Sequence, residues 1–100
     1  MNETLTPELP KHITPSVGRV LLYYPPGITP PAQPHPAIVS HVHSDTCVNV
    51  AIFDGNGRPY MTPPTSVLLV QPGQEPPAGG HYCVWMEFQV AQARKHGQIA

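Results

Sequence analysis

Apolar residues gather in short blocks that alternate with loops rich in proline and glycine along the chain. The blocks contain many β-branched and aromatic side chains, which favour strands, and prolines at their ends stop the strands from continuing. The expected strands are residues 17–24, two runs within 37–54, a weak candidate at 58–62 that proline interrupts, 65–70 and 81–86. Residues 87–95 have helix formers, an acid at the start and bases at the end, and so predict a short terminal helix.

The order of these elements sets the expected fold. Four or five short strands, with no helix long enough to connect parallel strands, predict a mainly β fold. We expect a small antiparallel β-barrel or sandwich of SH3-like size with a short C-terminal helix. The chain divides into an extended N-terminal arm over residues 1–16, a single β-rich domain with proline-rich loops over 17–96 and a tail over 97–100. Six of the twelve residues 25–36 are proline, which predicts an extended and stiff loop.

Residues 37–54 form the clearest element, a predicted β-hairpin whose loop is Ser44-Asp45-Thr46. Residues opposite one another share a face, so this loop fixes the pairing of the two strands. The expected pairs are His43 with Cys47, Val42 with Val48, Ser40 with Val50 and Ile38 with Ile52. One face would carry Ile38, Val42, Val48, Val50 and Ile52. The other face would carry Val39, His41, His43, Cys47, Asn49, Ala51 and Phe53.

Charge and hydropathy argue against two classes of partner. Only 11% of the residues are charged and the formal net charge is −1, so the chain has no basic surface for a run of phosphates or an anionic membrane. The longest apolar stretches fall far short of the roughly 20 residues that a membrane-spanning helix needs. The N-terminus lacks the basic and apolar residues of an export signal. We therefore expect no nucleic-acid or membrane partner and a location in the cytoplasm.

Histidine and cysteine residues occur at a spacing that suits a metal ion on a sheet. His41 and His43 point the same way from one strand, Cys47 lies across the turn, and His81 and Cys83 repeat the spacing. Together these side chains have the nitrogen and sulfur atoms of a tetrahedral site. No Cys-x-x-Cys or His-Glu-x-x-His anchor accompanies them, so we expect neither a metal nor any other cofactor.

Cys47 is also a candidate nucleophile, with His43 as its base and Asp45 as the residue that orients the histidine. However, polar side chains such as those of residues 44–46 bond their own backbone in turns, which explains them without catalysis. A disulfide between Cys47 and Cys83 is a further option, but without an export signal free thiols are the default. Since the chain has no paired carboxylates or nucleophile elbow, we expect that it is not an enzyme.

Five blocks of sequence occur in an order that is shared with a known group of small proteins. The blocks are Pro15-Ser-Val-Gly-Arg-Val-x-x-Tyr-Tyr24, Ala37-Ile-Val-x-His-Val42, Cys47-Val-Asn-x-Ala51, Phe53-Asp-x-Asn56-Gly57 and Gly79-Gly-x-Tyr-Cys-x-Trp-Met86. Over residues 15–95 the chain resembles small proteins encoded by tailed bacteriophages and prophages. The resemblance implies a phage-encoded protein in the cytoplasm of a bacterial host or in the virion. Such proteins are virion parts or host-takeover and anti-defence factors, including oligomeric binders that sequester nucleotide immune signals.

The first hypothesis is therefore a non-enzymatic phage accessory protein that forms a homo-oligomer and counters defence by binding a small nucleotide-like signal or a host protein. In this hypothesis Arg19 and Arg58 would each form two parallel hydrogen bonds with a phosphate of the ligand, and polar and aromatic side chains would surround the rest of it. The expected ligand-binding residues are Arg19, His41, His43, Asn49, Arg58, Tyr82 and Trp85. The alternative is a virion structural component, a head-decoration or tail-accessory protein whose N-terminal arm laces onto a neighbour. The third hypothesis is a small metal-binding or cysteine-dependent enzyme.

Overall fold

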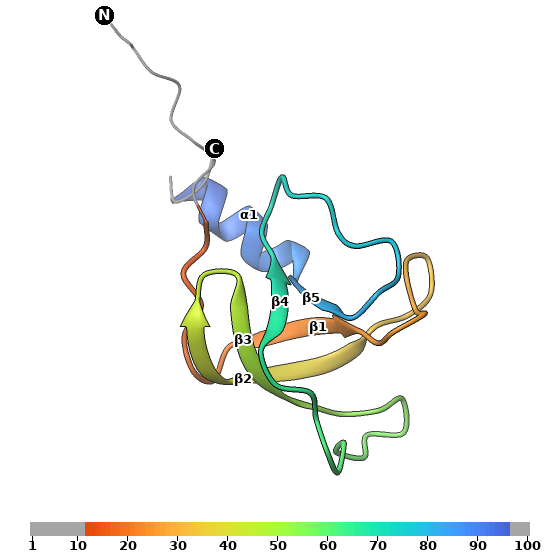
Figure 1. Cartoon of the computed structure of the whole chain (residues 1–100). Helices are drawn as coiled ribbons and strands as arrows, with labels where there is room; N and C mark the ends of the chain where they lie inside the picture. The colour runs from red at the N-terminus through yellow and green to blue at the C-terminus, as the bar shows by residue number, and fades with distance from the viewer. Residues whose placement is uncertain (1–11, 97–100) are drawn as a thin grey trace, which may run out of the picture.

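A computed structural model describes residues 12–96 as a closed barrel of five strands with a helix packed at one end (Figure 1). The elements are β1 (Val20–Tyr24), β2 (His35–Ser44), β3 (Cys47–Ile52), β4 (Val67–Val70), β5 (Tyr82–Trp85) and α1 (Glu87–Lys95). The prediction of a small, mainly β barrel with a short C-terminal helix is confirmed. The predicted tail and most of the predicted arm lie outside the described residues.

The strands pair in chain order, and β5 returns to pair with β1, which closes the barrel. Four of the five pairings are antiparallel, but β4 and β5 run parallel, with Leu69 opposite Cys83. The prediction of a wholly antiparallel sheet is wrong at this one pairing. A parallel pair needs a connection that travels back along the sheet, and the loop of residues 71–81 makes that return.

Apolar side chains from all five strands fill the barrel. The core residues are Ile13, Leu21, Tyr23, Ala37, Val39, Val48, Val50, Ile52, Val67, Leu69, Cys83, Trp85 and Ala93. Ile13 is only 3% exposed, although the sequence placed residues 1–16 outside the core. Its backbone N–H and carbonyl both bond the side-chain amide of Gln71, at 2.9 and 3.0 Å. The packed part of the chain therefore begins earlier than predicted.

The turn of the β2–β3 hairpin is shorter than predicted. It consists of Asp45 and Thr46 alone, and Ser44 pairs directly with Cys47. A register shift between Val42 and Ser44 leaves His43 without a partner across the ladder. The predicted pairing of His43 with Cys47 is therefore wrong.

A second irregularity changes which residues of β2 face the core. Val42 pairs with Val48 as predicted, but Val39 replaces Ser40 opposite Val50, and Ala37 replaces Ile38 opposite Ile52. The extra residue of a β-bulge lies between Val39 and His41, and a shift of one residue exchanges the two faces of a strand. Val39 is consequently buried, whereas Ile38, which was predicted to face inward with Val48, is 38% exposed.

Two loop regions also differ from their predicted forms. Residues 58–62 form no strand. Within this segment, Pro59 forms an isolated bridge with Phe53. Residues 25–34, expected to be extended throughout, contain two turns that backbone hydrogen bonds of 2.9 and 3.0 Å close. Prolines are therefore accommodated by turns in this segment.

The helix α1 has the predicted bounds, with Glu87 in its first turn and Arg94 and Lys95 in its last. A helix of nine residues is too short to be stable alone in water, so α1 depends on its packing. Ala93 is 4% exposed and belongs to the barrel core. Among residues 12–96, no helix has the length and apolar character needed to cross a membrane.

Candidate functional site

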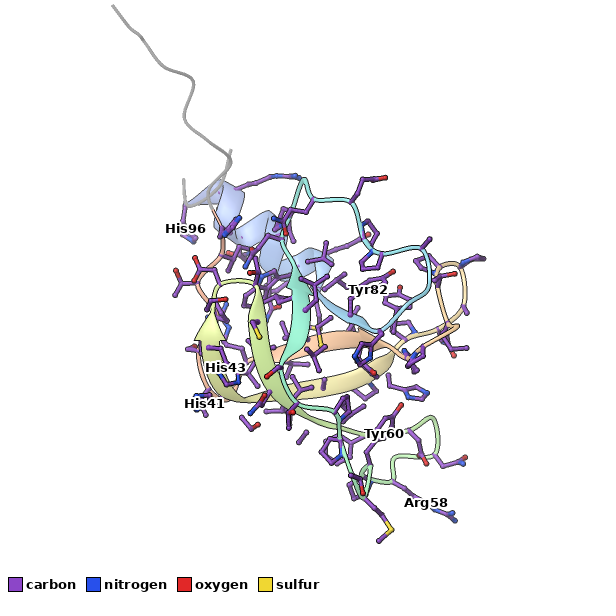
Figure 2. All side chains as sticks on the ribbon, viewed as in Figure 1. His41, His43, Arg58, Tyr60, Tyr82 and His96 are labelled. Carbon is purple, nitrogen blue, oxygen red and sulfur yellow. The ribbon has the colours of Figure 1, made fainter. Side chains whose placement is uncertain are left out.

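The seven residues predicted to bind a ligand lie in separate parts of the molecule. Arg19 lies over the ring of Trp85, with 5.2 Å between its guanidinium carbon and the ring centroid. Tyr82 is 1% exposed and stacks on Tyr24. His41 and His43 lie on the hairpin, and Arg58 lies on a loop at the end of the molecule opposite His96 (Figure 2). The predicted residues therefore do not form one site, and Arg19 and Arg58 do not act on one phosphate.

A pocket of about 390 Å³ lies between α1 and the residues that lead into β1. We call it the α1 pocket, and it is lined by Ile13, Arg19, Phe88, Gln89, Gln92, Ala93 and His96. Small-molecule sites typically have volumes of roughly 300–1,000 Å³, so the pocket has room for a small ligand. Its wall combines a guanidinium, two amides and an imidazole with three apolar side chains. This mixture suits a ligand that has both an anionic group and an apolar ring.

A tight turn places Arg19 at the pocket. The backbone N–H of Arg19 bonds the carbonyl of Ser16 at 3.2 Å, and Gly18 between them takes a φ of +96°. This left-handed conformation favours glycine because it has no Cβ. The carbonyl of Arg19 then accepts a hydrogen bond of 2.9 Å from the N–H of Val39, which anchors the turn to β2. The turn therefore fixes the backbone of Arg19 beside β2, and its side chain lines the pocket.

The helical repeat gathers the other side of the α1 pocket. Phe88 and Gln92 are four residues apart, as are Gln92 and His96, and Gln89 is three residues before Gln92. Residues at these separations are neighbours on a helix surface. The same face also carries Ala93, which packs into the core. The packing of α1 on the barrel therefore aligns its polar side chains along the pocket.

Gln71 holds the ring under Arg19 in place. This residue is 1% exposed, and its Oε1 accepts hydrogen bonds from the backbone N–H of Ile13 at 2.9 Å and the Trp85 Nε1–H at 3.2 Å. Its Nε2 donates to the carbonyls of Ile13 at 3.0 Å and Asp45 at 2.6 Å. All four hydrogen-bonding positions of the amide are thus used. Sequence reasoning missed Gln71 because a single glutamine at the end of an apolar run belongs to no motif.

The hairpin carries a second group of polar side chains. The rings of His41 and His43 approach to 4.7 Å between centroids, and the Nε2–H of His43 donates to Asn49 Oδ1 at 3.1 Å. The same oxygen accepts the backbone N–H of Ser66 at 2.6 Å. These three predicted residues share a face, as expected, but both imidazoles are exposed. Neither of the pockets described for residues 12–96 includes them.

The five candidate metal ligands do not converge on one point. The Nδ1 of His81 is 3.0 Å from the hydroxyl of Tyr23, and Cys83 is buried in the core. Both cysteines are free thiols. In the part of the chain that the structure describes, no three His, Cys, Asp or Glu side chains are grouped so that they can hold a metal ion.

Two tyrosine–histidine pairs form a cluster that sequence reasoning did not find. Tyr23 bonds His81, and the Nδ1 of His35 lies 2.6 Å from the hydroxyl of Tyr60. The rings of Tyr23 and Tyr60 meet edge to face at 6.3 Å. Burial, together with Tyr60 and Cys83, raises the pKa of Tyr23, so its hydroxyl stays neutral at physiological pH. The cluster fastens the loop that carries Tyr60 to the barrel, which is a structural role.

The α1 pocket is the better candidate of the two pockets described for residues 12–96. The other has a volume of about 220 Å³ and its lining includes no charged side chain. The α1 pocket includes Arg19, one of the residues expected from the sequence to bind a ligand, and Arg19 contacts a second one, Trp85. We therefore take the α1 pocket as the candidate site. No protein-family model, curated protein or solved structure matches the chain, so the site is interpreted from its own chemistry.

Proposed function

We propose that this protein is a non-enzymatic accessory protein of a bacteriophage that binds a small anionic ligand in the α1 pocket. The observation that carries the binding proposal is the placement of the Arg19 guanidinium over Trp85 at the wall of this pocket. The phage source is supported by the resemblance of the sequence blocks in residues 15–95.

The position of Arg19 over the Trp85 ring prepares it to bind an anion. A guanidinium attracted to the face of an indole keeps N–H groups free to donate to a ligand. These N–H groups form two parallel hydrogen bonds with one phosphate or carboxylate. Because the ring restricts the side chain before the ligand arrives, less conformational entropy is lost on binding. An anion at the wall of the α1 pocket is therefore the ligand group that Arg19 suits best.

The proposal is non-enzymatic because neither cysteine is arranged as a nucleophile. Cys47 lies opposite Ser44, while its candidate base His43 lies at the register shift and bonds Asn49 instead. Burial raises the pKa of the Cys83 thiol to about 12, so this thiol stays protonated and unreactive near neutral pH.

Sequestration of a small signal fits a protein of this kind. A binder of this type counters host defence by binding the signal molecule stoichiometrically, so it needs high affinity for the signal and no catalytic turnover. In the same proposal the chain forms a homo-oligomer, which places several copies of the α1 pocket on one particle.

Native mass spectrometry of the full-length protein purified from infected cells tests this function. We expect a bound mass of nucleotide size on the wild-type chain and its loss from R19A. The matched control is R58A, which removes the same charge from the loop at the other end of the molecule and retains the bound mass. An unliganded wild-type chain recovered mainly with virions would overturn the proposal and favour the virion component instead.

A further inference from the structure

An amide on the wall of the α1 pocket lacks a hydrogen-bond partner. Gln89 lines the pocket, and its Oε1 is buried without a partner within residues 12–96. A buried carbonyl oxygen in this condition is unfavourable, so the side chain gains a hydrogen bond by turning toward a donor on a ligand. Gln92, three residues later, supplies a second amide on the same wall. The pocket therefore suits a ligand whose edge carries a donor next to an acceptor.

An exposed aromatic ring stands beside these amides. Phe88 lines the α1 pocket and is 68% exposed, although phenylalanine is usually buried. Aromatic side chains at binding sites stack on planar rings, and nucleobases are one class of such rings. Phe88, Gln89 and Gln92 all line the pocket, and Phe88 lies about one helical turn from Gln92, so a ring packed on Phe88 has its edge near the glutamine side chains. This arrangement favours a flat heterocycle over an aliphatic ligand.

From these neighbouring groups we infer that the α1 pocket binds an adenine nucleotide, an inference that rests on the proposed function. Adenine presents an amino donor beside a ring-nitrogen acceptor, and a glutamine amide pairs with both at once. On its major-groove edge, which carries N7 and O6, guanine presents two acceptors and suits an arginine rather than an amide. Arg19 is the one side chain in the lining that carries a permanent positive charge. A single phosphate on Arg19, with the base stacked on Phe88 and its edge on the glutamines, uses the guanidinium, the aromatic ring and the amides of the lining.

Tryptophan fluorescence gives a direct readout because Trp85, the only tryptophan in the chain, lies under Arg19. The full-length protein is titrated with three probes: adenosine 5′-monophosphate, purine riboside 5′-monophosphate and ribose 5-phosphate. Purine riboside lacks the amino group of adenine, and ribose 5-phosphate lacks the base. We expect adenosine monophosphate to bind about tenfold more tightly than purine riboside monophosphate, because only adenine donates to Gln89.

Three variants assign the parts of the ligand. Q89L weakens adenosine monophosphate more than purine riboside monophosphate, because it removes two hydrogen bonds to the former and only the ring-nitrogen bond to the latter. F88A weakens both nucleotides about tenfold but not ribose 5-phosphate, because it removes the stacking surface. R19A weakens all three probes. The matched control Q33L, in an exposed loop, changes none of them.

The outcomes separate this inference from the proposed function. Equal affinity for the two nucleotides, or an equal effect of Q89L on both, would overturn the adenine assignment while a loss in R19A would still support an anion site. Failure of all three probes to bind, or binding that R19A leaves intact, would overturn both proposals. Circular dichroism spectra identical to that of the wild type show that each variant is folded.

Discussion

Burial controls the ionisation of Cys83, whose side chain lies fully inside the barrel core. The pKa of this thiol is raised by burial from 9.0 to about 12 in the folded protein. At a pH between these two pKa values, the Cys83 thiol loses its proton in the unfolded chain but keeps it in the folded protein. The free energy of unfolding therefore falls as the pH rises through this range, by about 1.4 kcal/mol per pH unit for one group.

Urea unfolding at a series of pH values from about 8 to 11 measures this dependence. The C83A variant removes the thiol, so we expect its stability to decline less steeply with pH than that of the wild type. Tyr60 and Tyr82 also have pKa values raised by burial, but they are present in both proteins and cancel in the comparison. The pKa of Tyr23 is raised by burial and in part by Cys83 itself, so the loss of Cys83 lowers it and makes the slope of C83A shallower still. The Q33L variant, in an exposed loop, changes no ionisable group and should keep the wild-type slope. Identical slopes for C83A and the wild type would show that Cys83 ionises normally.

At the scale of elements, the loops before β2 and β5 pack backbone against backbone. The N–H of Gly27 donates to the carbonyl of Gly79 at 2.7 Å. Gly80 takes a φ of +79°, and a Cβ at this position would meet the carbonyl oxygens of Pro25 and Ile28, the latter at 2.7 Å. These neighbours are backbone atoms, which cannot move aside as a flexible side chain can.

The G80A variant should therefore lose about 2–4 kcal/mol of stability, from the clash and from the strained backbone together. Gly79 provides the matched control, because a Cβ there has no atom within 4 Å and its φ is not positive. We expect G79A to change the free energy of unfolding by less than about 1 kcal/mol. Equal stability of the two variants would mean that the loops are not in contact.

The sequence identified the elements of the fold better than their pairing. Apolar blocks between prolines located the five strands, and helix formers with favourable end charges located α1. The bulge at Ser40 was not predictable, because Ile38 and Val39 are both apolar and either one fits an inward-facing position. The parallel pairing of β4 with β5 was missed for a similar reason, since it depends on how a loop without regular structure returns.

The candidate site was predictable only where residue type indicates chemistry. Arg19 and Trp85 were identified from the sequence because charged and aromatic side chains suggest binding. Gln71 and Gln89 were missed, since the role of an amide depends on which groups the fold brings within hydrogen-bonding distance. Gln71 lies 58 residues from its partner Ile13 in the chain, so no local pattern in the sequence could indicate this contact.

At the scale of the whole molecule, one core connects the N-terminal segment, the barrel and the helix. Ile13 and Ala93 are both members of that core. The N-cap residue of α1, Met86, provides no side-chain hydrogen bond to the first turn, so the helix has little stability of its own. We expect α1 and the barrel to unfold in one cooperative step. Far-UV circular dichroism and Trp85 fluorescence should then give the same midpoint in urea.

The variant Q71L tests how far this cooperativity extends. Leucine fills the space of the buried amide but leaves four groups unpaired: the N–H and carbonyl of Ile13, the carbonyl of Asp45 and the indole N–H of Trp85. An unpaired buried polar group costs about 1–3 kcal/mol, so a loss of about 3 kcal/mol is expected after partial relaxation. If the molecule is one unit, both midpoints fall together, whereas Q33L leaves them unchanged. A fall in the fluorescence midpoint alone would show instead that the ring under Arg19 loosens while the barrel and α1 stay folded.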